Sequence, residues 1–218
     1  MTVGLDKEMM ARRAAGDPNL PPNSEVNYWL ASQFPRNYRG WCIDVGASDG
    51  LFINSTVLLE KQFLWTVLSV DANPAYKHLL MKNRAFVKIC AVGRKPAEGV
   101  DFHVNCDNLE AFSALNPVKN HPRYKEEAGK RWETIKVPVR TLDQLLAEWE
   151  FPKLDALTVD VEGGERDVLA GLDWDRWNPK VVLLESWEEG DLDTEMNPRG
   201  YERVWRSAQN DAYIRRVE

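Results

Sequence analysis

Cysteine is scarce in this sequence, and long apolar runs are missing from it. The 218 residues include three cysteines, Cys42, Cys90 and Cys106, an odd number without the close spacing of a metal site. A disulfide framework and a structural zinc site are therefore not predicted, and we expect free thiols and a cytoplasmic location. No segment approaches the ~20 consecutive apolar residues that a transmembrane helix needs, so we expect no membrane partner.

Positive charge is also in short supply. Lysine and arginine number 28 against 34 acidic residues, which gives a net charge of -6. This balance excludes a broad basic surface, so we expect no nucleic acid partner. Hydrophobic residues at 44% and charged residues at 28% are typical of an ordinary globular domain.

From Trp41 onwards, short apolar runs alternate with amphipathic stretches. The apolar runs predict buried strands over residues 41–45, 66–70, 86–92, 100–104, 135–139, 154–159 and 181–184. The amphipathic stretches predict helices over residues 24–34, 51–62, 75–84 and 142–149, with another beginning at Glu165. Such alternation is typical of an α/β fold with a mostly parallel sheet and helices on both faces. Asn210-Asp211, between residues 201–205 and 212–217, predicts a C-terminal antiparallel hairpin.

The composition indicates one domain with an extension. Residues 1–23 are rich in proline and lack periodicity, so we expect a flexible N-terminal arm. Residues 24–218 are expected to form a single domain. Within it, the long polar segment 105–133 is expected to be an insertion or lid on the substrate side.

The segment after the first predicted strand, residues 44–50, is the candidate ligand loop. It has neither the Gly-Lys-Ser/Thr of a phosphate loop nor the middle glycine of a dinucleotide fingerprint, because Ser48 stands there. What remains is an acid followed by Gly46 and Gly50. Gly46 permits a tight turn close to a ligand, Gly50 allows the helix to pack on the strand, and Asp44 would hold a ligand ammonium group.

A second acid, Asp71, ends the second predicted strand, where a carboxylate accepts hydrogen bonds from ribose hydroxyls. Together the two acids fit a nucleoside that carries an amino acid and no diphosphate, which is the shape of S-adenosylmethionine. The alternative is a glycine turn that binds nothing, with Asp71 only capping the next helix.

These segments resemble the FkbM-type methyltransferases of the class I S-adenosylmethionine-dependent group. The resemblance covers roughly residues 41–186, and its most specific part is Asp160-Val161-Glu162-Gly163-Gly164-Glu165. Other matching segments are 44–50, 54–56, 58–60, 70–74, 112–115, 139–143, 154–159, 172–174 and 181–185. Asp71 stands where many relatives have glutamate, which keeps the same ribose chemistry.

The resemblance implies a Rossmann-like class I methyltransferase fold and O-methylation of a hydroxyl on a sugar, glycan or small metabolite. It implies the reaction but not the acceptor, because most of segment 105–133 matches nothing. The residues expected to form the cofactor pocket are Asp44, Gly46, Ala47, Ser48, Gly50, Asp71, Ala72, Asn73, Val92 and Asp160.

Three acids follow predicted strands and are the candidate catalytic residues. Asp160 and Glu162 follow one strand, where alternation would point both in one direction, and Glu185 ends the next. We hypothesise that Asp160 or Glu162 is the general base, or holds a divalent cation such as Mg²⁺ with Glu185 as a third contributor. Alternatively, Asp160 only positions the cofactor.

Other interpretations stay open at this point. Three histidines, His78, His103 and His121, are weaker candidates for the base. A nicotinamide-dependent oxidoreductase is a second possible function, although Ser48 counts against it. A non-catalytic binding scaffold with the same fold is a third.

Overall fold

The computed structural model describes residues 24–51, 54–106, 115, 131–187, 189–207 and 209–216. The arm predicted for residues 1–23 and most of segment 105–133 lie outside these ranges. The domain boundaries therefore stay predictions.

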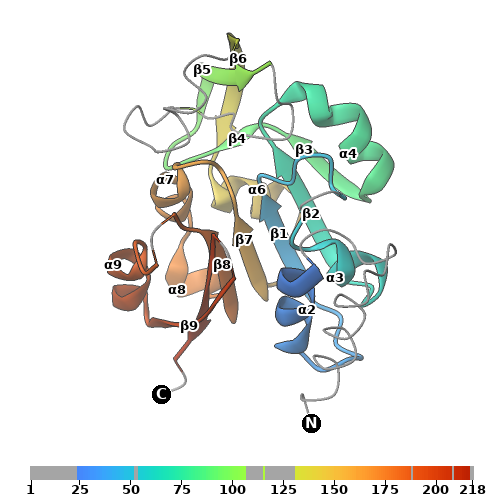
Figure 1. Cartoon of the computed structure of the whole chain (residues 1–218), viewed down its shortest axis with the longest axis vertical. Coiled ribbons are helices and arrows are strands. Elements are labelled where there is room, and N and C mark those ends of the chain that lie inside the picture. The colour runs from blue at the N-terminus through green and yellow to red at the C-terminus, as the bar shows by residue number, and fades with distance from the viewer. Residues whose placement is uncertain are drawn as a thin grey trace.

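A seven-stranded sheet forms the centre of the molecule, with strand order β3-β2-β1-β7-β8-β10-β9 (Figure 1). Its first five strands in this order are parallel, and β10 runs antiparallel to both β8 and β9. The bounds are β1 (Trp41–Val45), β2 (Thr66–Asp71), β3 (Phe86–Ile89), β7 (Ala156–Val159), β8 (Val181–Glu185), β9 (Tyr201–Ser207) and β10 (Asn210–Arg215). The mostly parallel sheet and the C-terminal antiparallel hairpin are confirmed.

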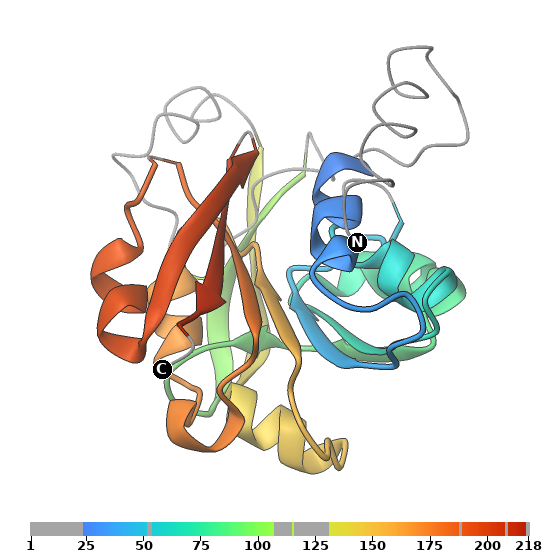
Figure 2. The ribbon, with the colours of Figure 1, turned by 90° about the horizontal axis from the view of Figure 1, so that it is seen from below.

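Alternate residues of β1 pack on opposite faces of the sheet, as the twofold period of a strand requires. Cys42 lies in one core cluster with residues of α2 and α3, whereas Ile43 lies in another with residues of α6, α7 and α8. Figure 2 shows α2 and α6 on opposite sides of the strands. The helical segments are α2 (Ser24–Ser32), α3 (Val57–Lys61), η1 (Pro74–Tyr76), α4 (Lys77–Asn83), α6 (Leu142–Glu148), α7 (Glu165–Leu169), α8 (Trp174–Trp177), α9 (Asp193–Met196) and η2 (Asn197–Arg199).

A second, three-stranded sheet lies beyond the carboxyl ends of the parallel strands (Figure 1). It consists of β4 (Ala91–Val92), β6 (Trp132–Arg140) and β5 (Ala97–Asn105), with β6 in the middle. The single strand predicted over residues 86–92 is therefore wrong. Its first half pairs with β2, and after Cys90 the chain pairs with β6 instead. Both halves are extended and apolar, so the apolar pattern alone does not show that the chain changes its pairing strand from β2 to β6.

The helix predicted over residues 51–62 begins only at Val57. Asn54 and Thr56 are buried, and their side chains donate to the carboxylate of Asp44. Short polar side chains that find such partners compete with helix formation. The polar residues 54–56 therefore lie outside the helix and are connected to the ligand loop through Asp44.

The turn of the C-terminal hairpin does not lie at Asn210-Asp211, as predicted, but before Asn210. Asn210 and Asp211 are the first residues of β10, paired with Ser207 and Arg206. Asp211 is fully buried, and it accepts hydrogen bonds from Arg206 and from the backbone N–H of Gly190. A buried ion pair, and not a turn, explains this acid.

None of the helices in the described ranges combines the length and the apolar character needed to cross a bilayer.

Candidate active site

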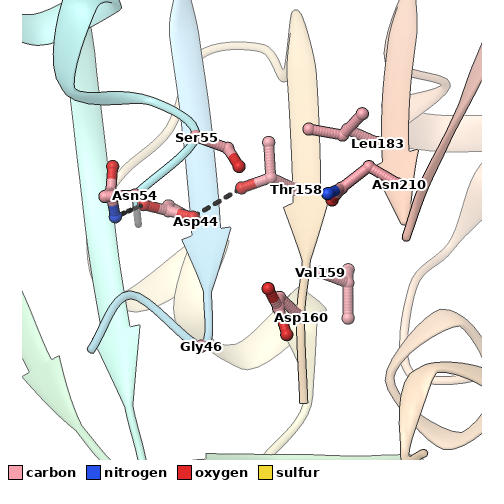
Figure 3. Close-up of a pocket in the computed structure, with 9 residues that line it drawn as sticks. All are labelled: Asp44, Gly46, Asn54, Ser55, Thr158, Val159, Asp160, Leu183 and Asn210. Carbon is pink, nitrogen blue, oxygen red and sulfur yellow. Dashed lines mark hydrogen bonds between the residues drawn. The ribbon is translucent and has the colours of Figure 1, made fainter. Parts of the chain in front are cut away.

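The loop after β1 lies directly against the end of β7 (Figure 3). Gly46 has a φ of +86°, and a Cβ at this position would lie 1.7 Å from the carbonyl oxygen of Asp160. Its backbone N–H donates to the carbonyl oxygen of Val70 at 2.9 Å. Only glycine fits this position, because any other residue would collide with backbone. The contact places the predicted cofactor loop and the predicted catalytic acid side by side.

Asp44 is buried at the base of the loop and accepts three hydrogen bonds from side chains. Its partners are Asn54 at 2.8 Å, Thr56 at 2.7 Å and Thr158 of β7 at 2.6 Å. Both carboxylate oxygens therefore already have donors within the chain, two of which are visible in Figure 3. The expected contact between Asp44 and a ligand ammonium group stays a prediction.

Arg84, which follows α4, reinforces this network from the other side. Its buried guanidinium lies 3.9 Å from Asp44, donates to Asn54 and Thr56 at 2.8 Å each, and pairs with Glu60 at 2.6 Å. Sequence reasoning missed Arg84, because nothing in a helix-terminal arginine marks it as buried.

Gly50 explains why the arginine fits. It has a φ of +76°, and a Cβ there would lie 2.5 Å from Cγ of Arg84 and 2.7 Å from Leu80. We expected Gly50 to let the following helix pack on the strand. Instead it admits the side chains of α4 and of the arginine that follows it.

Asp71 ends β2 and faces the ligand loop. One oxygen accepts the backbone N–H of Ser48 at 2.7 Å and the other accepts that of Asn73 at 2.8 Å. Burial raises the pKa of Asp71 from 3.8 to about 7, against the effect of these two N–H groups. Asn73, and not Asp71, caps the following helix by accepting from Ala75.

The remaining predicted pocket residues lie in the loop after β1, after the end of β2 and in β4. Ala47 is almost fully buried. Ser48 has a φ of 52°, which fits its place in the tight turn that begins at Gly46. Ala72 packs against the core of the second sheet, and Val92 is buried in β4.

A cavity of about 10 Å³ opens between the ends of β1 and β7, enough for about one water molecule. A cofactor would therefore have to lie outside this cavity.

The three predicted catalytic acids come together in the structure. A carboxylate oxygen from each of Asp160, Glu162 and Glu185 lies within 4.8 Å of those of the other two. We call this group the carboxylate cluster. Burial, and after it the charges of Asp160 and Glu162, raises the pKa of Glu185 well above its usual value. Glu185 is 5% exposed, and its Oε2 has no hydrogen-bond partner among the described residues.

Glu165 is a buried acid that sequence reasoning treated only as the start of a helix. It accepts the backbone N–H groups of Val161 at 3.1 Å and Gly163 at 3.2 Å. Burial raises its pKa to about 7. Glu165 therefore shapes the turn that carries Glu162, whose φ is 57°.

The histidines lie in different surroundings from the carboxylate cluster. His78 is part of α4, and His103 of β5 shares a hydrogen bond of 3.1 Å with Thr134. His121 lies outside the described residues.

The profile of the methyltransferase FkbM domain matches residues 44–203, well over half of the sequence. The chain belongs to the FkbM methyltransferase family. The match includes the ligand loop and the carboxylate cluster, so the predicted resemblance is confirmed.

Two curated relatives support this assignment. Methyltransferase sdnD of Sordaria araneosa is 28% identical over 173 residues, which cover 67% of this chain and 66% of that protein. Methyltransferase 1 of Beauveria bassiana is 28% identical over 173 residues, which cover 70% of this chain and 67% of that protein. The chain thus spans about two thirds of the length of these relatives.

The solved structure of methyltransferase FkbM from Methylobacillus flagellatus KT has a TM-score of 0.54 and 14% identity. The likeness covers 88% of this chain and 48% of that one, so the chain spans about half of its length. The two proteins share the Rossmann-like methyltransferase fold.

Asp71 is expected to make the unliganded protein less stable as the pH rises. Its pKa is about 7 when folded and about 4 when unfolded, so its stabilising contribution is complete below pH ~4 and is lost as the pH rises through ~7. Raising the pH from 6 to 8 should therefore remove about 1 kcal/mol of unfolding free energy through this group. Urea unfolding at the two pH values measures it. In Asp71→Asn this part of the pH dependence should vanish, and an unchanged pH dependence would contradict the assignment.

Proposed function

We propose that this chain is an S-adenosylmethionine-dependent O-methyltransferase that acts on a hydroxyl of a sugar, glycan or small metabolite. The observation that carries the proposal is the contact between the ligand loop and the carboxylate cluster. Gly46 touches the backbone of Asp160, so a methyl donor on the loop would lie beside acids that can receive the proton of a hydroxyl. The proposed location is cytoplasmic, in keeping with three free cysteines.

The loop offers features that suit the adenosyl cofactor. Gly46 carries no side chain, and Asp71 presents a carboxylate beside it whose lone pairs could accept two ribose hydroxyls in addition to its two backbone N–H groups. Ala47, Ser48, Gly50, Ala72, Asn73 and Val92 are proposed as the remaining pocket residues, with Asp44 at the base. S-adenosylmethionine would supply a methyl group on a sulfonium whose leaving group departs neutral, so no acid is needed for its departure.

The carboxylate cluster would act on the acceptor. An aliphatic hydroxyl is a weak nucleophile, and a positioned base typically contributes 10²–10⁴-fold. Asp160 is the member that touches the loop, so we assign to it the contact with the acceptor hydroxyl. Glu162 and the buried Glu185 lie within reach of the same proton.

The same cluster also suits a divalent cation. Three carboxylates form a hard oxygen donor set of the kind that Mg²⁺ prefers. Oε2 of Glu185 is buried without a hydrogen-bond partner in the part of the chain that the structure describes, which is costly unless something else neutralises it. A cation held by Asp160, Glu162 and Glu185 would lower the pKa of an acceptor hydroxyl. These residues would then orient the acceptor in place of taking its proton directly.

A nicotinamide-dependent oxidoreductase is the weaker candidate. Ser48, at the position of the middle glycine of a dinucleotide fingerprint, has its N–H already bonded to Asp71. A non-catalytic scaffold is also weaker, because three acids kept within 4.8 Å of one another cost stability.

Cofactor binding is expected to depend on Asp71. In isothermal titration, S-adenosylhomocysteine should bind with one-to-one stoichiometry, whereas NADH should give no saturable heat. Asp71→Ala removes the acceptor for two hydroxyls and should weaken binding by about 10–100-fold. Asp175→Ala, which removes an exposed acid of α8, is the control and should bind like the wild type. Binding of NADH, or equal binding by both variants, would contradict the proposed pocket.

Methyl transfer is expected to depend on Asp160. Radiolabelled S-adenosylmethionine is incubated with a panel of sugars and polyhydroxylated metabolites, and an alkali-stable methyl ether should form. Asp160→Asn should lower turnover about 10²–10⁴-fold and leave the affinity for S-adenosylhomocysteine within a few fold. Asp167→Asn, on the exposed side of α7, should keep wild-type turnover.

Two results would contradict this assignment. Full turnover by Asp160→Asn would remove Asp160 from the mechanism, and label recovered only in an alkali-labile ester would exclude O-methylation of a hydroxyl. Addition of EDTA and then of Mg²⁺ separates the two roles of the cluster. A cluster that acts only as base is insensitive to both, whereas one that holds a cation loses and regains activity.

A further inference from the structure

A second cavity lies at the opposite edge of the central sheet from the ligand loop. It has a volume of about 370 Å³, within the range of small-molecule sites. Its walls come from the segment before β7, the segment between α8 and β8, and the end of β10. The lining residues are Phe151, Pro152, Lys153, Leu154, Asp155, Arg176, Trp177, Asn178, Lys180 and Arg215.

The described lining residues include four cations and one acid. Lys153, Arg176, Lys180 and Arg215 are all exposed, and Asp155 is the one acid among the lining residues that the structure describes. The chain as a whole has a net charge of -6, so this concentration of positive charge runs against the overall balance. A concave surface of one sign concentrates ions of the other sign.

The one acid of the cavity is already engaged. Asp155 accepts from Tyr38 at 2.6 Å and from the backbone N–H of Trp41 at 2.8 Å, and it pairs with Lys153 at 3.0 Å. These contacts join the cavity wall to the start of β1. Asp155 and Lys153 thus neutralise each other, which leaves three cations among the described lining residues.

Those three cations have no acidic partner among the described residues. The guanidinium of Arg176 stacks on the indole of Trp177, 4.5 Å from the ring centroid. Lys180 donates to the carbonyl oxygen of Gln33 at 2.5 Å, and Arg215 donates to that of Asn178 at 3.0 Å. Neutral partners of this kind hold the side chains in place without cancelling their charge.

We propose that this cavity binds a small metabolite through a phosphate or pyrophosphate group. Two guanidinium groups and one ammonium group offer the donors that such anions take, and the two or more negative charges of such an anion offset most of their positive charge. Phe151 and Trp177 also line the cavity, although both side chains are largely buried in the core.

This site is distinct from the proposed methyltransferase site. β7 begins after Asp155 and ends before Asp160, and β8 begins after Lys180 and ends at Glu185. The two strands that carry the carboxylate cluster therefore separate the two sites by their full length. Binding at the second cavity should not compete with the adenosyl cofactor.

The test is isothermal titration of the full chain with pyrophosphate, at an ionic strength held constant with potassium chloride. The wild type should bind one pyrophosphate saturably, and saturating S-adenosylhomocysteine should not displace it. Arg176→Gln and Arg215→Gln should each weaken binding by about tenfold or more. Lys82→Gln, which removes an exposed cation of α4, is the matched control and should leave the affinity unchanged.

Several results would overturn the proposal. Non-saturable heats in the wild type would show only general screening of charge. An equal loss of affinity in Lys82→Gln would show an effect of net charge and not of this cavity. Displacement by S-adenosylhomocysteine would place the anion in the methyltransferase site. Circular dichroism of each variant confirms that the fold is retained.

Discussion

The buried carboxylate of Asp44 is the interaction on which the site depends. A buried charge is tolerated only when it is paired and hydrogen-bonded, and here three side-chain donors and the guanidinium of Arg84 meet that need. The donors come from the loop segment and from β7, so one carboxylate joins β1 to both. Removal of any one donor would weaken the compensation of a charge in the interior. The same two strands, β1 and β7, bring Gly46 against Asp160 through backbone hydrogen bonds.

In the carboxylate cluster, by contrast, three acidic groups lie close to one another. Its three acids repel one another, and one oxygen of the buried Glu185 has no hydrogen-bond partner among the described residues, so the free protein holds a group that destabilises it. The surrounding core offsets that cost, because β7 and β8 are buried along their whole length. Local destabilisation of this kind is common at functional sites, where a bound ligand can compensate for it. The hydrogen-bonded network around Asp44 thus lies at the base of the ligand loop, and the mutually repelling acids of the carboxylate cluster lie beside that loop.

Much of the fold and the site could be predicted from local patterns. The apolar runs predict β1, β2, β7 and β8, and acids placed after parallel strands are brought to one edge by topology alone. The burial of Arg84 could not be predicted, nor could the unwound segment before α3, because both depend on contacts with residues distant in the sequence: Thr56 donates to Asp44, and Arg84 donates to Asn54 and Thr56. The transfer of the chain from β3 to β4 was hidden for a similar reason. Pairing partners are a tertiary property, and two adjacent extended segments look like one.

A crystal structure of the protein grown with S-adenosylhomocysteine and Mn²⁺ would show whether the cofactor lies between Asp71 and the carboxylate cluster. We expect the ribose hydroxyls on the carboxylate of Asp71, with the sulfur directed toward the carboxylate cluster beside Gly46. Anomalous density between Asp160, Glu162 and Glu185 would identify the cluster as a cation site, and its absence would leave it with the role of base. An adenosyl group bound elsewhere, or a sulfur directed away from Asp160, would contradict the account.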